Sequence, residues 1–273
     1  MHKNSRNIKL KLAYDGTDFS GWQRQEDGCR TVQGLVEDAL RKIHKKPITL
    51  TGSGRTDSGV HAAAQVANFY TSIQSIEASR FIPALNSLLP RDVRVLEAEE
   101  THEDFHARFD ARLRTYRYYF INRRETMPWE LRYAWKLRRN PDIGKLNDYA
   151  RLLRGEMDFT TFAVPGDKSK SRHRFIFGAI FFFEGDKLVF EISANAFLWK
   201  MVRSIAGTLI HFEEKGFSPD YFREVIESHN RQLSGPTAPP EGLFLWKVDY
   251  RICPETDTMT FRKPVVHREH IRA

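Results

Sequence analysis

The order in which strand-like and helix-like segments follow one another constrains the fold of this chain more than any other feature. Residues 7–14 alternate polar and apolar side chains, which is typical of a half-buried strand. Thr31 is a suitable N-cap for a helix whose apolar residues recur at helical spacing as far as Ile43, before Pro47 ends it. The remaining elements predicted in this part are strands at residues 48–51, 62–70 and 93–99 and a helix at residues 76–88. The resulting order is β-α-β-β-α-β.

The same order of elements returns in the second part of the chain. Strands are predicted at residues 114–121, 174–183, 187–193 and 244–250, and helices at residues 146–154, 197–212 and 219–228. The sequence therefore predicts an α+β protein made of two sequential split-βαβ, or ferredoxin-like, halves with antiparallel and mixed sheets. We expect an N-terminal half over residues 1–105 and a C-terminal half over residues 106–273, with residues 101–112 as the hinge.

The charge and the cysteine content of the chain narrow its environment and its partners. The net charge is +8 and the pI is about 9.5, which favours an anionic partner, most often a nucleic acid. The two cysteines, Cys29 and Cys253, lie far apart, which excludes a cysteine-rich zinc site and favours a reducing compartment. No signal-peptide pattern and no long apolar run occur, so we expect a cytoplasmic protein without a membrane partner.

A glycine-rich run over residues 52–62 carries the most reactive pair of side chains. It places Asp57 two residues after Arg55, within a segment that contains three glycines. A carboxylate on a tight loop can act as a nucleophile or as a base, and the nearby arginine can keep it ionised or bind a phosphate. The alternative is an ordinary glycine-rich turn with a surface ion pair.

Two further segments combine arginines with aromatic side chains. The loop of residues 21–25 joins a tryptophan to Arg24 and two amides, which favours either a binding loop or a buried tryptophan with solvated neighbours. Arg108 and Arg114 precede Tyr116 in a stretch where arginines and aromatics alternate, as suits a polyanion whose bases can stack. The alternative there is a strand with one aromatic face in the core and basic side chains in water.

A third segment lies in the helix predicted at residues 197–212. Trp199, Lys200, Arg203 and Gly207 are expected to share the side opposite the buried apolar stripe. The small Gly207 would leave room for Arg203 to lie along the helix. The alternative is a solvated basic face.

Several chemistries find no support in the sequence. The phosphate-binding loop of nucleoside triphosphatases, the nucleophile elbow of hydrolases and the zinc-deaminase pattern do not occur. His61 and His106 have no partner at metal-ligand spacing, so we expect structural histidines. The sequence therefore predicts neither a cofactor nor a metal ion.

Seven motifs in order make the chain resemble the tRNA pseudouridine synthases of the TruA type. The resemblance runs from the first strand to Tyr250, and the segment Trp199-Lys200 departs from the residues that the family more often has there. The motifs are Tyr14-Asp-Gly with Gly21-Trp-Gln-Arg-Gln25, Gly54-Arg-Thr-Asp-Ser-Gly-Val-His-Ala62, Asp104-Phe-His-Ala-Arg-Phe109, Arg114-Thr-Tyr-Arg-Tyr118, Asp158-Phe-Thr-Thr-Phe162, Asn195-Ala-Phe with Met201-Val-Arg203, and Glu241-Gly-Leu243.

The resemblance implies a pseudouridine synthase fold around a basic cleft and a function without a cofactor. It implies that Asp57 is the catalytic acid, supported by Arg55, Tyr116 and Arg203. It also implies a homodimer that modifies uridines at positions 38 to 40 in the anticodon arm of tRNA. We expect the substrate to be bound by Tyr116, Arg24, Arg108, Arg114 and Lys200. The alternative function is a non-catalytic RNA-binding protein with duplicated ferredoxin-like modules.

Overall fold

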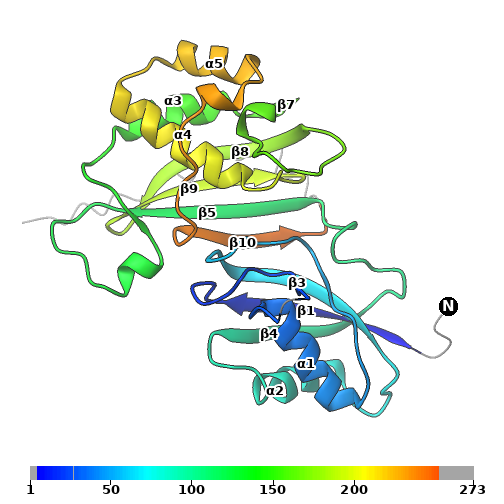
Figure 1. The fold of residues 1–273 in the computed structure, drawn as a ribbon. Helices are drawn as coiled ribbons and strands as arrows, with labels where there is room; N and C mark the ends of the chain where they lie inside the picture. The colour runs from blue at the N-terminus through cyan, green and yellow to red at the C-terminus, as the bar shows by residue number, and fades with distance from the viewer. Residues whose placement is uncertain (1–4, 27, 252–273) are drawn as a thin grey trace, which may run out of the picture.

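One mixed β-sheet runs through both halves of the molecule (Figure 1). The structure is a computed structural model that describes residues 5–26 and 28–251. Its strands are β1 (Arg6–Tyr14), β2 (Thr51–Gly52), β3 (His61–Thr71), β4 (Val93–Thr101), β5 (Leu113–Ile121), β6 (Trp135–Lys136), β7 (Gly155–Asp158), β8 (His173–Glu184), β9 (Lys187–Ala194) and β10 (Leu243–Asp249). The order across the sheet is β4-β1-β3-β10-β5-β9-β8-β7, with β2 added to β3 and β6 to β5.

The last strand joins the two halves. β10 runs parallel to β3, where Phe244 is paired with His61, and antiparallel to β5 on its other side. The prediction of an α+β fold with antiparallel and mixed pairing is confirmed. The two halves do not form separate sheets, however, because β10 lies between β3 and β5 and pairs with both.

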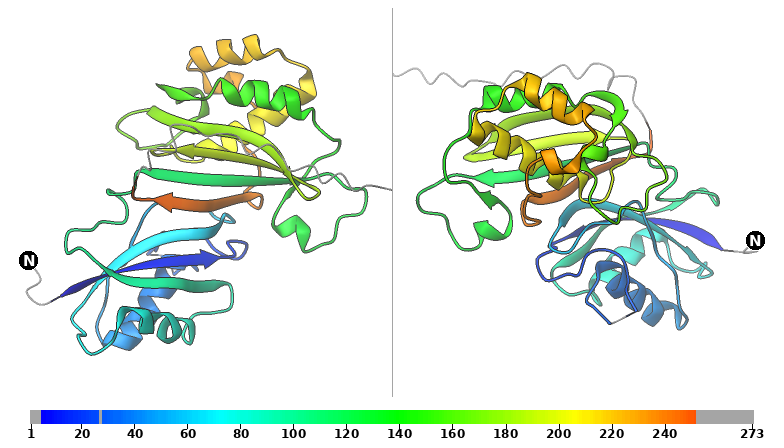
Figure 2. Two further views of the ribbon diagram at one scale, coloured as in Figure 1. Left: turned by 180° about the vertical axis from the view of Figure 1, so that it is seen from behind. Right: turned by 45° about the horizontal axis from the view of Figure 1, so that its top comes forward.

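The helices cover the two parts of this sheet separately. They are α1 (Val32–His44), α2 (Phe81–Asn86), α3 (Ile143–Arg151), α4 (Met201–Lys215) and α5 (Pro219–Glu227). Figure 2 shows α1 and α2 beside the N-terminal strands and α3, α4 and α5 beside the C-terminal strands. Apolar residues from both parts belong to one continuous core, which makes the inner walls of the junction rigid.

Several predicted boundaries are wrong for identifiable reasons. The strand expected at residues 48–51 is only the two-residue β2, and the helix expected at residues 76–88 is a 3₁₀ turn at Ala78–Arg80 followed by the short α2. The helix expected at residues 197–212 begins later, because Lys200 takes a left-handed conformation with a φ of 58°. It continues to Lys215 and ends at Gly216, which is also left-handed. The short strands β6 and β7 were not predicted.

His61 lies at the junction between the halves and has a structural role. Its ring stacks on that of Phe244, with 4.5 Å between the centroids. Its Nδ1 accepts the backbone N–H of Gly16, so Nε2 carries the proton and donates to the carbonyl of Arg132. Burial lowers the pKa of this imidazole. Both ring nitrogens therefore serve the fold.

The described part of the chain gives no sign of a membrane span or of a metal centre. None of its helices is both long and apolar enough to cross a bilayer. None of its groups of His, Cys, Asp and Glu side chains is arranged to hold a metal ion.

Candidate active site

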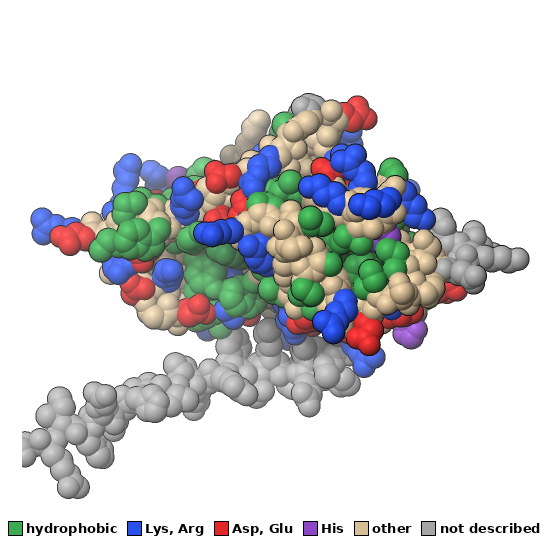
Figure 3. Space-filling model, turned by 90° about the horizontal axis from the view of Figure 1, so that it is seen from below, with side chains coloured by type: hydrophobic (Ala, Val, Ile, Leu, Met, Phe, Trp, Pro, Cys, Tyr) green, Lys and Arg blue, Asp and Glu red, His purple; other side chains and the backbone are tan. Residues whose placement is uncertain are grey.

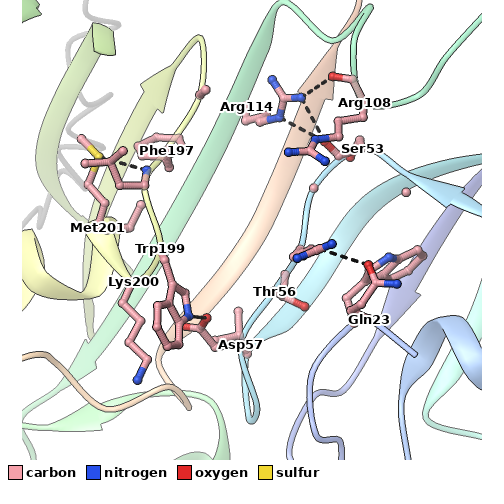
Figure 4. A pocket seen from close by; sticks show the side chains of 18 of the residues that line it. Gln23, Ser53, Thr56, Asp57, Arg108, Arg114, Phe197, Trp199, Lys200 and Met201 are labelled. Carbon is pink, nitrogen blue, oxygen red and sulfur yellow. Dashed lines mark hydrogen bonds between the residues drawn. The ribbon is translucent and has the colours of Figure 1, made fainter. Parts of the chain in front are cut away.

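A cavity of about 1240 Å³ lies at the junction of the two halves, and the carboxylate of Asp57 faces it. Its walls come from the loop before α1, the glycine-rich run, the residues before β5, and the segment that leads into α4. Figure 4 shows Asp57 between the Gln23 side of the cavity and the Trp199 side. A cavity of this size can take a ligand as large as a nucleotide.

Both oxygens of Asp57 accept hydrogen bonds from α4 and the residues before it. Nη1 of Arg203 lies 2.9 Å from Oδ2, and the indole Nε1 of Trp199 lies 2.9 Å from Oδ1. The side chains of Arg203 and Asp57 are 12% and 18% exposed, so solvent screens this ion pair only weakly. The pair holds a negative charge at a fixed place in the cavity, where it can act as a nucleophile or a base.

The loop of residues 20–22 packs against the turn that carries Asp57 and forms a hydrogen bond with it. Trp22 donates its backbone N–H to the carbonyl of Thr56, and the hydroxyl groups of Thr56 and Tyr14 are 2.8 Å apart. Gly21 has a φ of +94°, and a Cβ on it would lie 2.7 Å from the oxygen of Thr56. Only glycine combines this conformation with this close approach. Trp22 itself is buried, which agrees with the structural alternative for this loop.

Arg203 is anchored to Ala238 by both its side chain and its backbone. Its Nε donates to the carbonyl of Ala238, and its own carbonyl accepts the N–H of Ala238. Gly207, one turn further along α4, lies against this same segment, because a Cβ on it would be 1.9 Å from the oxygen of Pro236. The prediction that Gly207 makes room for Arg203 is wrong. Gly207 instead lets residues 236–238 approach the helix closely enough to hold Arg203.

We expect Gly207→Ala to destabilise the protein by about 3 kcal/mol. The new methyl group would overlap the backbone of Pro236, and the buried helix α4 cannot easily move away from it. Urea unfolding of the purified variant measures this loss. Gly144→Ala in α3 is the matched control, since its Cβ would meet no backbone and only one side-chain atom, Oδ1 of Asp142, at 3.1 Å. Equal stability of the two variants would contradict the close approach described for Gly207.

Tyr116 projects from β5 and lines the same cavity. It is 8% exposed and makes an edge-to-face contact with Phe197, with 5.1 Å between the ring centroids. Burial, with the nearby charge of Asp57, raises the pKa of Tyr116 to about 12. The phenol is therefore protonated at neutral pH, so it can stack on a ring or donate a hydrogen bond, but it is not a base there.

Arg114 binds protein backbone with every N–H group that it has. Its five donors reach four carbonyl groups, which come from three separate loops. The acceptors are the carbonyls of Ser53, Arg108, Ala111 and Asn195. No N–H group remains for a phosphate, so the geometry does not favour the substrate contact expected for Arg114. It holds the glycine-rich run against the C-terminal half instead, as Figure 4 shows.

The other predicted site residues differ in their position. Arg55 and Arg108 are exposed at the edge of the cavity, and Nε of Arg55 donates to the side chain of Gln23. The ammonium group of Lys200 lies 4.8 Å from the ring centre of Trp199. Arg24 lies outside the cavity lining and forms ion pairs with acidic residues of α1, at distances of 3.3 Å and 3.5 Å.

Basic side chains are also present beyond the cavity. Figure 3 shows Lys and Arg distributed over one face of the molecule, among hydrophobic and acidic side chains. The positive charge is therefore not confined to a single patch on that face. This distribution suits contacts with a long polyanion more than with a small anion.

Sequence reasoning missed one residue and one hydrogen bond of the site. Asp167 accepts the backbone N–H of Trp199 at 2.6 Å and forms an ion pair with Arg172. Burial raises the pKa of Asp167, but hydrogen bonds from Ser169 and Trp199 outweigh this effect and lower it. No local pattern marks Asp167. The hydrogen bond from Trp199 to Asp57 was also missed, although both residues stood in segments that the sequence had singled out.

Comparison with known proteins supplies independent information. The sequence matches the family described as tRNA pseudouridine synthase over residues 12–110 and 149–251. It is 54% identical to tRNA pseudouridine synthase A of Treponema denticola over 252 residues, which cover 91% of this chain and 94% of that protein. It is 50% identical to the protein of that name from Treponema pallidum over 85% of this chain and 84% of that protein. A Clostridium perfringens protein, tRNA pseudouridine synthase A 2, is 42% identical over 90% of this chain and 100% of its own length.

Proposed function

The chain belongs to the tRNA pseudouridine synthase family, and from this we propose that it isomerises uridines at positions 38 to 40 of the tRNA anticodon arm, with Asp57 as the catalytic acid. The enzyme converts uridine to pseudouridine. The observation that carries the assignment of Asp57 is its ion pair with Arg203 in the wall of the cavity between the halves. The alternative of a non-catalytic RNA-binding protein is not favoured, because the matching family and the matching relatives are described as synthases.

The chemistry of this isomerisation matches the side chains in the cavity. The bond between N1 of uracil and C1′ of ribose breaks, the base turns, and C5 forms the new bond to C1′. The proton on C5 leaves and N1 gains one, so that nothing is oxidised and no phosphate is consumed. One ionised carboxylate beside the ribose is sufficient: it can add to C1′, add to C6 of the ring, or take the C2′ proton.

We assign each nearby group a role that its geometry supports. Arg203 holds the carboxylate of Asp57 in place through one hydrogen bond and stays in place itself through Ala238. Tyr116, which is protonated and forms an aromatic pair with Phe197, stacks on the uracil and can donate a hydrogen bond through its hydroxyl group. Arg55 is exposed at the edge of the cavity. It either fills the space in the RNA stack that the flipped-out uracil has vacated, or it binds a phosphate.

The proposed substrate contacts are made by basic residues that line the cavity and reach solvent. Arg108 and Lys200 lie at the edge of the cavity, where the phosphates that flank a flipped-out uridine would pass. We propose that Arg24 contributes only indirectly, because its partners are on α1. We further propose that the enzyme acts as a homodimer in the cytoplasm, which the resemblance to the family suggests.

The position of the modified uridines is tested with tRNA transcripts that carry tritium at C5 of uridine. Wild-type enzyme is expected to release tritium from a transcript with uridines at positions 38 to 40. A matched transcript with cytidine at those three positions should release none. Equal release from both transcripts would overturn the anticodon-arm assignment while leaving the isomerase activity in place. The absence of release from either transcript, with binding intact, would contradict the activity itself.

A further inference from the structure

The indole of Trp199 covers the carboxylate on which the proposed function depends. Its Nε1–H donates to Oδ1 of Asp57, at 2.9 Å, while Arg203 occupies Oδ2. Figure 4 shows the ring lying directly beside Asp57, within the cavity. Oδ1 is the oxygen that the inner ion pair with Arg203 leaves for a ligand. In this structure the indole therefore stands where a ribose or a uracil would approach it.

The backbone of Trp199 is fixed, whereas its side chain is held lightly. Asp167 accepts the backbone N–H of Trp199, and the next residue, Lys200, has the left-handed conformation that precedes α4. The side chain of Trp199 is 48% exposed, although its ring is one of the largest in the protein. Its ring also contacts the Lys200 ammonium group and lies 3.6 Å from a Cβ placed on Gly166. A half-exposed ring on a fixed backbone can change its rotamer without disturbing the core.

We propose that Trp199 is a gate residue. Its indole blocks access to Asp57 in the free enzyme and moves away from Asp57 when the target nucleotide enters the cavity. This inference rests on the proposed function, because it supposes that a nucleotide must reach Asp57. A hydrogen bond to a carboxylate stabilises its charge and makes it a weaker nucleophile or base. Release of the indole therefore opens the cavity and activates the acid in one movement.

The gate has a definite kinetic consequence. The closed form cannot bind the substrate, so the apparent affinity equals the affinity of the open form multiplied by the fraction of enzyme that is open. Once the nucleotide is bound, the indole no longer touches Asp57, and the chemical step does not depend on it. Loss of the indole N–H should thus lower KM and leave kcat unchanged. If Trp199 only oriented Asp57 for the reaction, loss of its N–H would instead lower kcat and leave KM unchanged.

The test compares Trp199→Phe, which keeps an aromatic ring but lacks the N–H, with the wild type in tritium release from tRNA. We expect a KM about three- to tenfold lower, with kcat unchanged within about twofold. The matched control is Trp129→Phe, at a tryptophan that is 64% exposed and outside the cavity lining. This control should keep both wild-type constants. A lower kcat in Trp199→Phe, or an unchanged KM, would overturn the gate.

Tryptophan fluorescence gives a second readout, which does not require turnover. Movement of the indole away from Asp57 and Lys200 should change the emission of the wild type and of Trp129→Phe when tRNA binds. The change should be absent in Trp199→Phe. An equal change in all three proteins would contradict the movement of Trp199. If the wild type binds tRNA but releases no tritium, the proposed function fails, whereas the emission change still reports on the gate.

Discussion

Asp57→Asn is expected to reduce turnover of tRNA by at least about 10⁴-fold while leaving tRNA affinity within about threefold of the wild type. Asparagine has nearly the same shape, and its amide oxygen can still accept a hydrogen bond from Arg203 or Trp199. It cannot act as a nucleophile or a base, however, because the amide carries no negative charge. Single-turnover tritium release measures the chemical step, and filter binding measures the affinity.

The loss in this variant must be separated from unfolding. Asp57→Asn leaves the weakly screened guanidinium of Arg203 without its opposite charge, so we expect its urea midpoint to lie below the wild-type value while the variant stays folded in the assay buffer. Glu99→Gln is the matched carboxylate-to-amide control, since Glu99 is exposed and its ion pair with Lys9 lies on β1 and β4, outside the cavity lining. It should keep full activity. Near wild-type turnover by Asp57→Asn would remove Asp57 from the chemistry.

Arg203→Lys is expected to lower kcat by about 10²- to 10³-fold, although it conserves the charge. One reason to expect this is that a planar guanidinium can bind a carboxylate by two parallel hydrogen bonds, which a lysine cannot do. The structure gives a different reason: Nη1 binds Asp57 while Nε binds the carbonyl of Ala238, in two directions. A lysine ammonium group is a single point and cannot reach both partners in this geometry. The carboxylate would lose its fixed position, and kcat should fall more than the affinity for tRNA.

The same kinetic assay tests this variant against a matched arginine-to-lysine exchange. Arg223→Lys on α5 serves this purpose, because Arg223 is exposed and its ion-pair partner among the described residues is Asp220, one turn away. It should behave as the wild type. Full activity in Arg203→Lys would show that positive charge alone is sufficient beside Asp57, and that the anchor at Ala238 has no part in catalysis.

The local part of the fold could be predicted from the sequence, and the long-range part could not. Strands such as β1 and helices such as α1 have a strong periodicity and clear end signals, and the structure contains them close to the predicted bounds. The parallel pairing of β10 with β3 depends on residues about 180 positions apart, and nothing local encodes it. The start of α4 depends on the left-handed Lys200, a residue type for which this conformation is uncommon.

The site divides in the same way. Asp57 and Arg203 stand out in the sequence by their residue types and neighbours, and the structure brings them within 2.9 Å. Arg114 stood in a stretch rich in arginines and aromatic residues, which suggested a contact with the substrate. Its actual partners are carbonyl groups from three loops, and this arrangement is not visible in the sequence. Gly207 was expected to make room for Arg203, and only the fold shows that its neighbour is instead the segment of residues 236–238.

The most direct test of the whole account is single-turnover tritium release from a tRNA transcript labelled at C5 of uridine, with wild type and Asp57→Asn at equal bound fractions. The account predicts complete release by the wild type and a rate at least about 10⁴-fold lower for the variant, although both bind the transcript. Comparable rates from the two proteins would contradict the central claim that the carboxylate of Asp57, fixed by Arg203, carries out the isomerisation.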